Sequence, residues 1–198
     1  MLHLLAATKN RGKLKEIEKL FSSSSIRVKL YFLPDFHITV DCLETGKTFI
    51  ENAEQKSRFY GKLVPDMYTV GEDSGLVVEA LNGGPGIYSS RYSGPGATEE
   101  KNIVKLLEQL QGIENRKAKF VTAVCLSKNG QVIQTFTGEV EGIIIDEKRG
   151  SGGFGYDPVF YYPPLKKTFA ELTTEEKNQI SHRARAFQKL REFLESLG

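Results

Sequence analysis

Two β-rich segments joined by a tight turn constrain the fold of this chain most strongly. Residues 119–126 and 131–145 are rich in β-branched and aromatic side chains, and Lys128-Asn129-Gly130 lies between them. An Asn-Gly pair between two such segments is a strong signal of a β-hairpin. The chain is therefore predicted to contain at least one antiparallel pair of strands.

Helical and strand patterns alternate along the rest of the chain. Apolar and β-branched runs at 2–7, 27–32 and 68–80 predict strands, the last of them a bent pair. Helical spacing predicts helices at 11–21, 48–62 and 98–110, the third capped by Thr98. The first helix should bury a stripe that includes Ile17 and Glu18, and a closing helix a stripe from Ile180 to Leu197. We therefore predict an α/β fold, with a mixed twisted sheet flanked by helices.

Composition limits the class of protein. The 198 residues, 39% hydrophobic and 26% charged, fit one globular domain over residues 1–198. A formal net charge of +2 is too small to favour nucleic acid as a partner. Cys42 and Cys125 lack metal-binding or redox spacing, so we expect free thiols in a reducing compartment. Because residues 1–7 lack the basic start of a signal peptide and no apolar stretch has membrane-spanning length, we expect a cytoplasmic protein with no membrane partner.

Two adjacent acids follow the apolar run 68–70. Glu72 and Asp73 are predicted to lie at a strand end, where the chain bends at Gly75. Neighbouring side chains of a strand point to opposite faces, so only one of the two acids can enter a given cleft. A carboxylate on a rigid strand end is well placed to hold a divalent metal or to orient a water. The alternative is a pair of solvated acids in a turn.

A basic segment joins the first predicted strand to the first predicted helix. The positive end of a helix and its exposed N–H groups make such a junction a natural phosphate site. Hydroxyl, amide and basic side chains that suit phosphate oxygens follow one another here: Thr8, Lys9, Asn10, Arg11, Gly12 and Lys13. The spacing is not that of a Walker P-loop. The alternative is a helix capped by Asn10 with solvated basic neighbours.

A second pair of charged residues lies around the predicted helix 48–62. Glu44 lies in the loop before this helix and is free to reach a metal. Lys56 lies on the helix and could face the same cleft as Asp73. The alternative is a surface helix with ordinary charge.

The glycine-rich segment 150–158 contains the spacing Gly-x-Gly-x-x-Gly. A dinucleotide fingerprint must open a helix, whereas Pro158 favours an extended chain here, so we reject that interpretation. Phe154 and Tyr156 suggest a platform for stacking a base, with Asp157 accepting from base N–H groups. The alternative is a mobile hairpin loop.

Three polar residues begin the closing helix. Ser181 is predicted to cap it, which places His182 and Arg183 in the first turn, and Lys177 lies just upstream. Cations do not suit a helix start, so a role for His182 and Arg183 in binding competes with a structural one.

Taken together and in order, these segments resemble the inosine triphosphate pyrophosphatase family. The resemblance spans the chain from Thr8 to Arg183, and the main departure is Gly71-Glu72 where the family usually has Ala-Asp. The specific segments are Thr8-x-Asn10-x-x-Lys13, Glu51-Asn52-Ala53-x-x-Lys56, Asp73-Ser74-Gly75-Leu76, Gly83-x-Pro85-Gly86-x-Tyr88-Ser89-x-Arg91-Tyr92, Gly153-Phe154-Gly155-Tyr156-Asp157-Pro158 and Ser181-His182-Arg183.

The resemblance implies an elongated, two-lobed single domain with a central cleft, usually as a homodimer. It implies Mg²⁺ as cofactor, held by Glu44 and Asp73, with Asp73 also the catalytic base and Lys56 neutralising developing charge. The segment from Thr8 to Lys13 would bind the triphosphate, and Ser74 would contact the substrate nearby. Phe154 would stack on the purine. The remaining residues implied for binding the base and its 6-keto oxygen are Gly155, Tyr156, Asp157, Lys177, His182 and Arg183.

The function that the resemblance implies is hydrolysis of non-standard purine nucleoside triphosphates. Inosine, deoxyinosine and xanthosine triphosphates would give the monophosphate and pyrophosphate, cleansing the nucleotide pool, with Mg²⁺-activated water attacking on the α-phosphate side. Two alternatives stay open: a pyrimidine nucleoside triphosphate pyrophosphatase of the related fold, and a non-catalytic nucleotide-binding regulator. A single-stranded RNA binder would need a basic stripe that the chain lacks.

Overall fold

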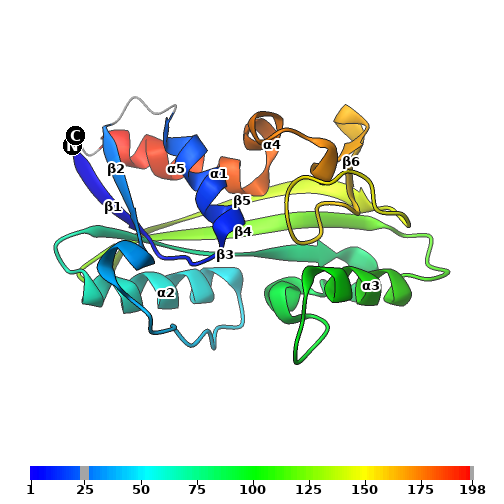
Figure 1. Ribbon diagram of the computed structural model, residues 1–198, viewed down its shortest axis with the longest axis horizontal. Coiled ribbons are helices and arrows are strands. Elements are labelled where there is room, and N and C mark those ends of the chain that lie inside the picture. The colour runs from blue at the N-terminus through cyan, green and yellow to red at the C-terminus, as the bar shows by residue number, and fades with distance from the viewer. Residues whose placement is uncertain (23–26, 197–198) are drawn as a thin grey trace. The chain divides into compact units, whose positions relative to one another are not determined.

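The structure is a computed structural model that describes residues 1–22 and 27–196 (Figure 1). Over these residues, seven strands form a sheet in the order β2-β1-β3-β4-β5-β6-β7. Strand β1 pairs in parallel with β2 and β3, while β5 and β6 pair antiparallel, as do β6 and β7. The prediction of a mixed sheet is therefore confirmed. The strands are β1 Leu2–Ala6, β2 Val28–Phe32, β3 Tyr68–Val78, β4 Lys117–Lys128, β5 Gln131–Ile144, β6 Phe160–Tyr162 and β7 Lys167–Thr168.

Threonines cap two of the helices, and one of them, Thr98, was predicted as a cap from the sequence. Thr48 and Thr98 accept hydrogen bonds from Glu51 N and Lys101 N, which caps the second and third helices. No described helix is long and apolar enough to cross a membrane. The α-helices are α1 Arg11–Ser22, α2 Phe49–Leu63, α3 Glu99–Gln109, α4 Thr174–Ile180 and α5 His182–Ser196.

The chain divides into two compact units. The first unit comprises Met1–Asp73, Thr122–Gly138 and Arg183–Gly198, and the second comprises Ser74–Val121 and Glu139–His182. Strands β3, β4 and β5 each contribute residues to both units. The single domain over residues 1–198 stays a prediction.

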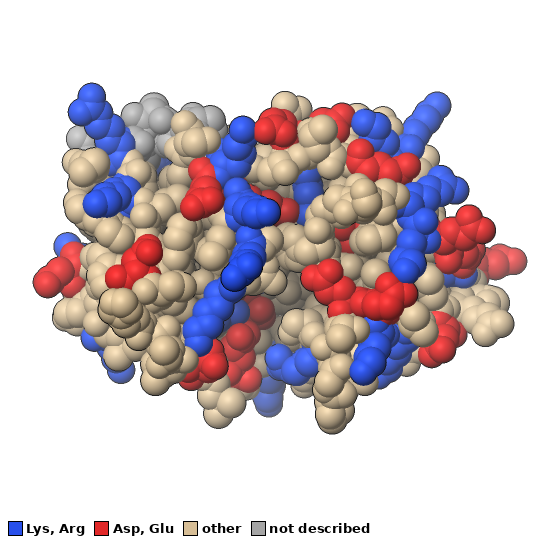
Figure 2. All heavy atoms as spheres, viewed as in Figure 1, with Lys and Arg blue, Asp and Glu red and all other residues tan. Residues whose placement is uncertain are grey.

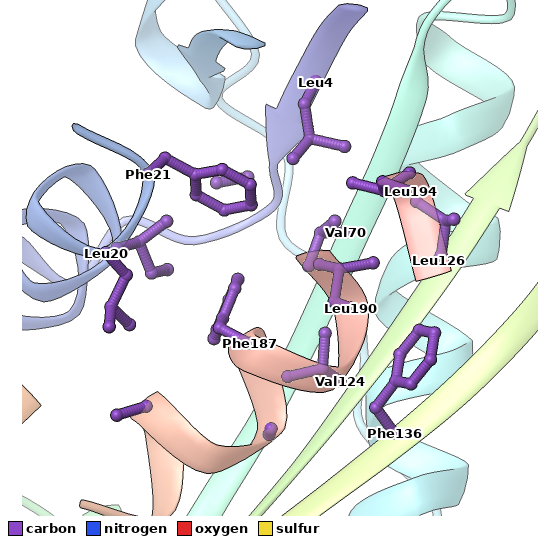
Figure 3. Packing of buried hydrophobic residues seen from close by; sticks show 14 residues of the cluster. Leu4, Leu20, Phe21, Val70, Val124, Leu126, Phe136, Phe187, Leu190 and Leu194 are labelled. Atoms are coloured by element: carbon purple, nitrogen blue, oxygen red, sulfur yellow. The ribbon is translucent and has the colours of Figure 1, made fainter. Parts of the chain in front are cut away.

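The sheet of the first unit is buried on both faces. Leu4 and Ala6 of β1 pack in one cluster with α1 and α5, and Leu5 and Ala7 pack in another with Tyr60 of α2. Because alternate side chains of a strand point to opposite faces, the short apolar strand β1 packs against helices on both faces of the sheet. Figure 3 shows the first of these clusters, in which Phe21, Val70, Val124, Phe187 and Leu190 converge from α1, β3, β4 and α5.

The second unit has a core of its own. Leu76 and Val78 of β3 pack with α3, with the inner residues of β4 and β5, and with an aromatic group around Phe120. The ring centroids of Phe120 and Phe160 are 4.5 Å apart, and those of Phe160 and Phe169 are 4.9 Å apart. The same cluster includes Tyr156 and Val159, so the glycine-rich segment and the residue after it are anchored in this core.

The predicted hairpin is confirmed. Strands β4 and β5 are joined by Asn129 and Gly130, whose φ angles are 51° and 70°. Two consecutive positive φ angles define the tight turn whose twist suits a hairpin, and Asn-Gly tolerates them best.

The predicted bend in the third strand is wrong. Strand β3 runs without interruption from Tyr68 to Val78, and Gly75 does not adopt a positive φ. Leu76 and Val78 are fully buried, so packing holds the chain extended beyond the Ser-Gly pair. Glu72 and Asp73 therefore lie in mid-strand, just beyond the last residue pair with β1, which joins Ala6 to Val70.

Two helix predictions also need correction. On α1 it is Glu16, not Glu18, that is buried, because Glu16 has a cationic partner in the interior. The predicted closing helix is two helices separated at Ser181, and Ile180 belongs to α4 in the second unit. Leu197 lies outside the described residues.

Candidate active site

The loop from β1 to α1 is organised by its own polar side chains. Asn10 Oδ1 accepts a hydrogen bond from Lys13 N at 3.0 Å, and Thr8 Oγ1 accepts one from Asn10 N at 3.2 Å. Asn10 is thus the N-cap of α1, which was one of the two interpretations of this residue. Lys9 Nζ donates to Thr39 O and pairs with Asp41 at 2.7 Å.

Basic side chains gather over α1. Its sequence begins Arg-Gly-Lys-Leu-Lys, and Arg11 and Lys15 are exposed. Figure 2 shows Lys and Arg side chains in a column on this face of the first unit. Cations in the first turn oppose the helix dipole, whereas an anion bound at this end would be favoured by both the dipole and the side chains.

Asp73 is held by one amide and one ammonium. Asn52 Nδ2 donates to Asp73 Oδ2 at 3.1 Å, and Lys56 Nζ lies 3.4 Å from Asp73 Oδ1. The same ammonium lies 3.1 Å from Glu44 Oε2, and Gly46 N donates to Asn52 Oδ1 at 2.9 Å. Lys56 and Asp73 are thus in contact, while a shared cleft stays a prediction. Helix α2 and the loop before it therefore hold Asp73 in one orientation.

The protonation of Asp73 is set by two opposing effects. Burial raises the pKa of Asp73, and Lys56, Lys13 and the hydrogen bond from Asn52 act to lower it. The net shift of the pKa is upward. A carboxylate with a raised pKa is a stronger base than an ordinary aspartate.

The residues present fit a divalent cation. Glu44 and Asp73 already share one cation, the Lys56 ammonium, between their carboxylates. Mg²⁺ is usually bound by one or two carboxylates and keeps several waters. Among residues 1–22 and 27–196 no group of three or more His, Cys, Asp or Glu side chains is placed to hold a metal, so the site offers two protein ligands.

Glu72 belongs to a separate, buried ion-pair cluster in the first unit. Arg183 Nε and Nη2 lie 3.0 and 2.9 Å from Glu72 Oε1, Arg183 Nη1 pairs with Glu16, and Lys13 Nζ lies 3.5 Å from Glu72. Although burial by itself raises the pKa of Glu72, Arg183, Lys13 and Lys56 hold that pKa at about 2. Burial lowers the pKa of Lys13, and Glu72 opposes this shift. Glu72 therefore pairs with Arg183 and Lys13, while Asp73 pairs with Lys56. This is expected because neighbouring side chains of a strand point to opposite faces.

The contacts of Arg183 differ from those expected of a residue that reads a base. Its side chain is 1% exposed, and its guanidinium donates to Glu16 and Glu72. Contact between Arg183 and the 6-keto oxygen stays a prediction.

Sequence reasoning missed Glu16 and gave Asn52 no role beyond its place in a family segment. Glu16 lies beside Ile17 at the edge of the apolar stripe of α1, and Asn52 precedes the fully buried Ala53. The available signal was a polar residue at the border of a buried face, which requires an interior partner.

The glycine-rich loop of the second unit is built around Phe154. Gly150, Gly153 and Gly155 all have positive φ angles, between 62° and 81°. Asp157 Oδ2 accepts from Phe154 N at 2.9 Å and pairs with Lys177 Nζ at 2.5 Å. Three residues predicted to surround a base are thus in mutual contact.

The other predicted residues of the second unit are placed as follows. Tyr156 is buried, and its hydroxyl donates to Ser89 O at 2.8 Å. His182 is 4% exposed and stacks on Phe120, with ring centroids 4.8 Å apart. Ser74 is half-buried on β3. The roles of these residues toward a substrate stay predictions.

Comparison with known proteins identifies the family. Residues 4–193 match the sequence profile of the Ham1 family. The dITP/XTP pyrophosphatase of Geobacillus kaustophilus is 44% identical over 199 residues, covering 100% of this chain and 96% of that protein.

Solved structures agree with this sequence match. A Ham1 protein from Staphylococcus aureus is 41% identical with a TM-score of 0.87, covering 99% of this chain and 100% of that chain. A HAM1 protein from Coxiella burnetii is 39% identical with a TM-score of 0.89 and the same coverage. The resemblance to the inosine triphosphate pyrophosphatases is confirmed, and the chain belongs to the Ham1 family.

Proposed function

We propose that the protein is a dITP/XTP pyrophosphatase, which converts deoxyinosine, inosine and xanthosine triphosphates to the monophosphate and pyrophosphate. Relatives that carry this name and match nearly the whole chain support the proposal. The structural observation that best supports the proposal is the environment of Asp73. Its two carboxylate oxygens contact Lys56 Nζ at 3.4 Å and Asn52 Nδ2 at 3.1 Å.

Asp73 acts as the base. Water attacks the α-phosphorus, the bond to the bridging oxygen breaks, and pyrophosphate leaves, while Asp73 accepts the proton of the water. Because burial raises the pKa of Asp73, its carboxylate is a stronger proton acceptor than an exposed aspartate. Asn52 holds the carboxylate in place, and Lys56 compensates the negative charge that develops.

The loop from Thr8 to Lys13 binds phosphate groups. The N-terminus of α1 directs backbone N–H groups and the positive end of its dipole toward this loop. Lys13, held by Glu72, adds a charge that is fixed in position before the substrate arrives. Such preorganised cations favour a pyrophosphate leaving group.

Mg²⁺ is the cofactor of this proposal, and Glu44 and Asp73 would hold it. When bound, it supplies positive charge for phosphate oxygens and lowers the pKa of water. The proposal keeps Phe154 as the residue that stacks on the purine, and Ser74, His182 and Arg183 as residues that bind the substrate.

The test is an assay of nucleoside triphosphates with Mg²⁺ in water enriched in ¹⁸O. We expect pyrophosphate from inosine, deoxyinosine and xanthosine triphosphates, with the label in the monophosphate. Label in the pyrophosphate would place the attack on the β-phosphorus, and orthophosphate with diphosphate as products would contradict the proposal. A pyrimidine panel distinguishes the related pyrimidine enzymes, and absence of turnover on every nucleotide would favour a binding protein.

We also propose that the protein is a homodimer, on the strength of the family resemblance. Light scattering coupled to gel filtration would give about twice the 22.2 kDa chain mass. A mass of one chain at assay concentrations would contradict it.

A further inference from the structure

The loop that carries Glu44 is fastened to helix α2 by polar side chains. Residues 38–47, which we call the Glu44 loop, have no regular secondary structure and run beside α2 before they join it (Figure 1). In such a segment no strand or helix supplies partners for the backbone N–H and C=O groups. Side chains of α2 supply several of these partners, so the helix sets the course of the loop.

Tyr60 anchors the first half of the Glu44 loop. Its hydroxyl accepts a hydrogen bond from Cys42 N at 3.2 Å and donates one to Val40 O at 3.3 Å. Tyr60 is buried and packs in the apolar cluster that contains Leu5 and Leu33. Because packing fixes the ring, its hydroxyl is a fixed point for two backbone groups of the loop.

Gln55 anchors the second half of the loop. Its Oε1 accepts a hydrogen bond from Thr45 N at 2.9 Å, and its Nε2 donates one to Thr45 Oγ1 at 3.0 Å. The next residue, Gly46, donates from its N to Asn52 Oδ1 at 2.9 Å, and a Cβ added to Gly46 would lie 2.6 Å from the same oxygen. The backbone of the loop therefore lies directly against α2 at this point.

These anchors lie on both sides of Glu44. Cys42 N is held two residues before it, and Thr45 N is held directly after it. Leu43 is 80% exposed, so burial of this neighbour does not fix the backbone. The hydrogen bonds to the helix therefore determine where the loop presents the Glu44 carboxylate, which lies 3.1 Å from Lys56 Nζ.

One helix thereby places both carboxylates of the proposed cation site. Asn52, Lys56 and Tyr60 are spaced by four residues, so their side chains lie on one face of α2. Asn52 and Lys56 contact Asp73, and Lys56 also contacts Glu44. With Tyr60 on the same face, the helix fixes the Glu44 loop relative to Asp73.

We propose that Tyr60 and Gln55 are positioning residues, which hold Glu44 where its carboxylate and that of Asp73 can bind one divalent cation. This inference rests on the proposed function. It goes beyond the family resemblance, because Gln55 falls at a position that the segment Glu51-Asn52-Ala53-x-x-Lys56 leaves open, and Tyr60 lies outside that segment.

A positioning role should be visible in the affinity for the cation. Mg²⁺ demands near-ideal geometry and gives up its waters reluctantly, so a carboxylate that moves freely is a poorer ligand. Loss of a residue that orients a metal ligand typically weakens metal binding or activity by roughly 10–100-fold. A merely structural role would instead lower the stability of the fold and leave the affinity of the folded protein for the cation unchanged.

The first experiment reads the order of the loop without metal or nucleotide. Tyr60→Phe removes one hydroxyl and keeps the ring, and Gln55→Leu removes both hydrogen bonds to Thr45 at similar size. Backbone hydrogen exchange is followed residue by residue with NMR. We expect exchange to become faster at Cys42 N in the first variant and at Thr45 N in the second, because each amide loses its acceptor.

Tyr68→Phe and Gln188→Leu are the matched controls. Tyr68 packs against the other apolar cluster of the first unit, and Gln188 is exposed on α5, where it donates to Glu192. Neither control should change exchange at the two amides. Unchanged exchange at one amide would overturn the role of the residue that holds it, and unchanged exchange at both would overturn the proposal.

The second experiment measures the cation directly. Mn²⁺, detected by electron paramagnetic resonance, is titrated in the presence of α,β-methylene inosine triphosphate, whose bridging carbon prevents release of pyrophosphate. For Tyr60→Phe and for Gln55→Leu we expect the Kd for Mn²⁺ to rise about tenfold, with both controls at the wild-type value. Glu44→Gln, which removes the ligand itself, should bind Mn²⁺ at least as weakly. A wild-type Kd in both test variants would overturn the proposal.

The dependence of turnover on Mg²⁺ separates positioning from a damaged fold. In the test variants the Mg²⁺ concentration for half-maximal rate should rise about tenfold, with kcat at saturating Mg²⁺ within about threefold of wild type. Excess Mg²⁺ compensates for a misplaced ligand, whereas it does not repair a damaged fold. A loss of kcat that saturating Mg²⁺ does not restore would contradict the positioning role. Gln55 is only half-buried, so Gln55→Leu tests the same idea if Tyr60→Phe fails to fold.

The two proposals fail separately. If Glu44→Gln binds Mn²⁺ as tightly as wild type, Glu44 does not hold the cation, and the metal assignment of the proposed function fails together with this inference. If Glu44→Gln weakens binding and both test variants keep the wild-type Kd, the positioning role fails and the proposed function stands.

Discussion

At the scale of single residues, two adjacent acids of β3 have different tasks because they face different neighbours. Asp73 contacts Lys56 and Asn52, and burial raises its pKa. Glu72 contacts Arg183 and Lys13, which hold its pKa at about 2. One is suited to accept a proton, and the other to remain charged.

Replacement of Asp73 by Asn should remove turnover and leave the fold intact. An amide cannot accept a proton from water, and it binds Mg²⁺ poorly, so kcat should fall roughly 100-fold or more. Turnover is measured by pyrophosphate release, and the fold by circular dichroism. The exposed Asp66→Asn is the matched control and should keep wild-type turnover. If Asp73→Asn retains turnover near that of wild type, the base is another residue.

Replacement of Glu72 by Gln should destabilise the protein at neutral pH. The change removes the carboxylate that pairs with Lys13 and one of the two carboxylates that pair with the buried Arg183. We expect the unfolding free energy to fall by on the order of 3 kcal/mol. Urea titration at pH 7 measures this loss, with the exposed Glu18→Gln as control. A loss no larger than that of the control would show that the cluster does not stabilise the fold.

The same glutamate should make stability depend on pH. Its pKa is about 2 in the folded protein against an ordinary 4.5, so its contribution is complete above pH 4.5 and is lost as the pH falls toward 2. Wild type should therefore lose unfolding free energy over this window more steeply than Glu72→Gln. Urea midpoints at several pH values without added metal measure the two slopes, and parallel slopes would contradict the assignment.

At the scale of elements, the position of Asp73 depends on close packing of α2 against β3. A Cβ on Gly71 would overlap Ala53 O and lie 2.5 Å from Ser57 N. The helix backbone can approach this closely only because Gly71 has no side chain. The same helix carries Asn52 and Lys56, so this contact sets their distance from Asp73.

Gly71→Ala should therefore reduce both stability and activity. The added methyl group must push the backbone of α2 away, which costs about 1–3 kcal/mol or more and moves Asn52 and Lys56. Urea unfolding and pyrophosphate release measure the two effects on the same sample. Full activity in a clearly destabilised variant would show that the spacing of α2 from β3 does not govern the site.

At the scale of the whole molecule, each of the two cores is a cluster of buried apolar side chains. The cluster of the first unit includes Leu4, Phe187 and Leu190, and that of the second includes Leu106, Phe160 and Phe169. We expect removal of Mg²⁺ with a chelator to abolish turnover and to leave the thermal midpoint unchanged within about 2 °C, since the two carboxylates remain paired with Lys56. Added Mg²⁺ should restore turnover. A large fall of the midpoint on chelation would reveal a structural metal.

The Asn129-Gly130 turn and the cap at Thr98 followed from the sequence, because each depends on local backbone preferences. The mixed sheet followed from the hairpin and the alternation of helices and strands. The continuous β3 did not follow, because burial of Leu76 and Val78 overrode the local turn signal of Ser74-Gly75.

What the sequence by itself determined was the longer helices and the hairpin, the family, and the residue types available for chemistry. Local patterns carry this information, since hydrophobic period, capping and motif order are all read along the chain. Only the tertiary structure decided the partners of each charge. Glu16 and Arg183 are far apart in the sequence, and so are Asp157 and Lys177, yet each pair is buried together. The reason is physical: a charge can be buried only where the fold brings an opposite charge to it, and that meeting depends on the packing of whole elements rather than on any local pattern.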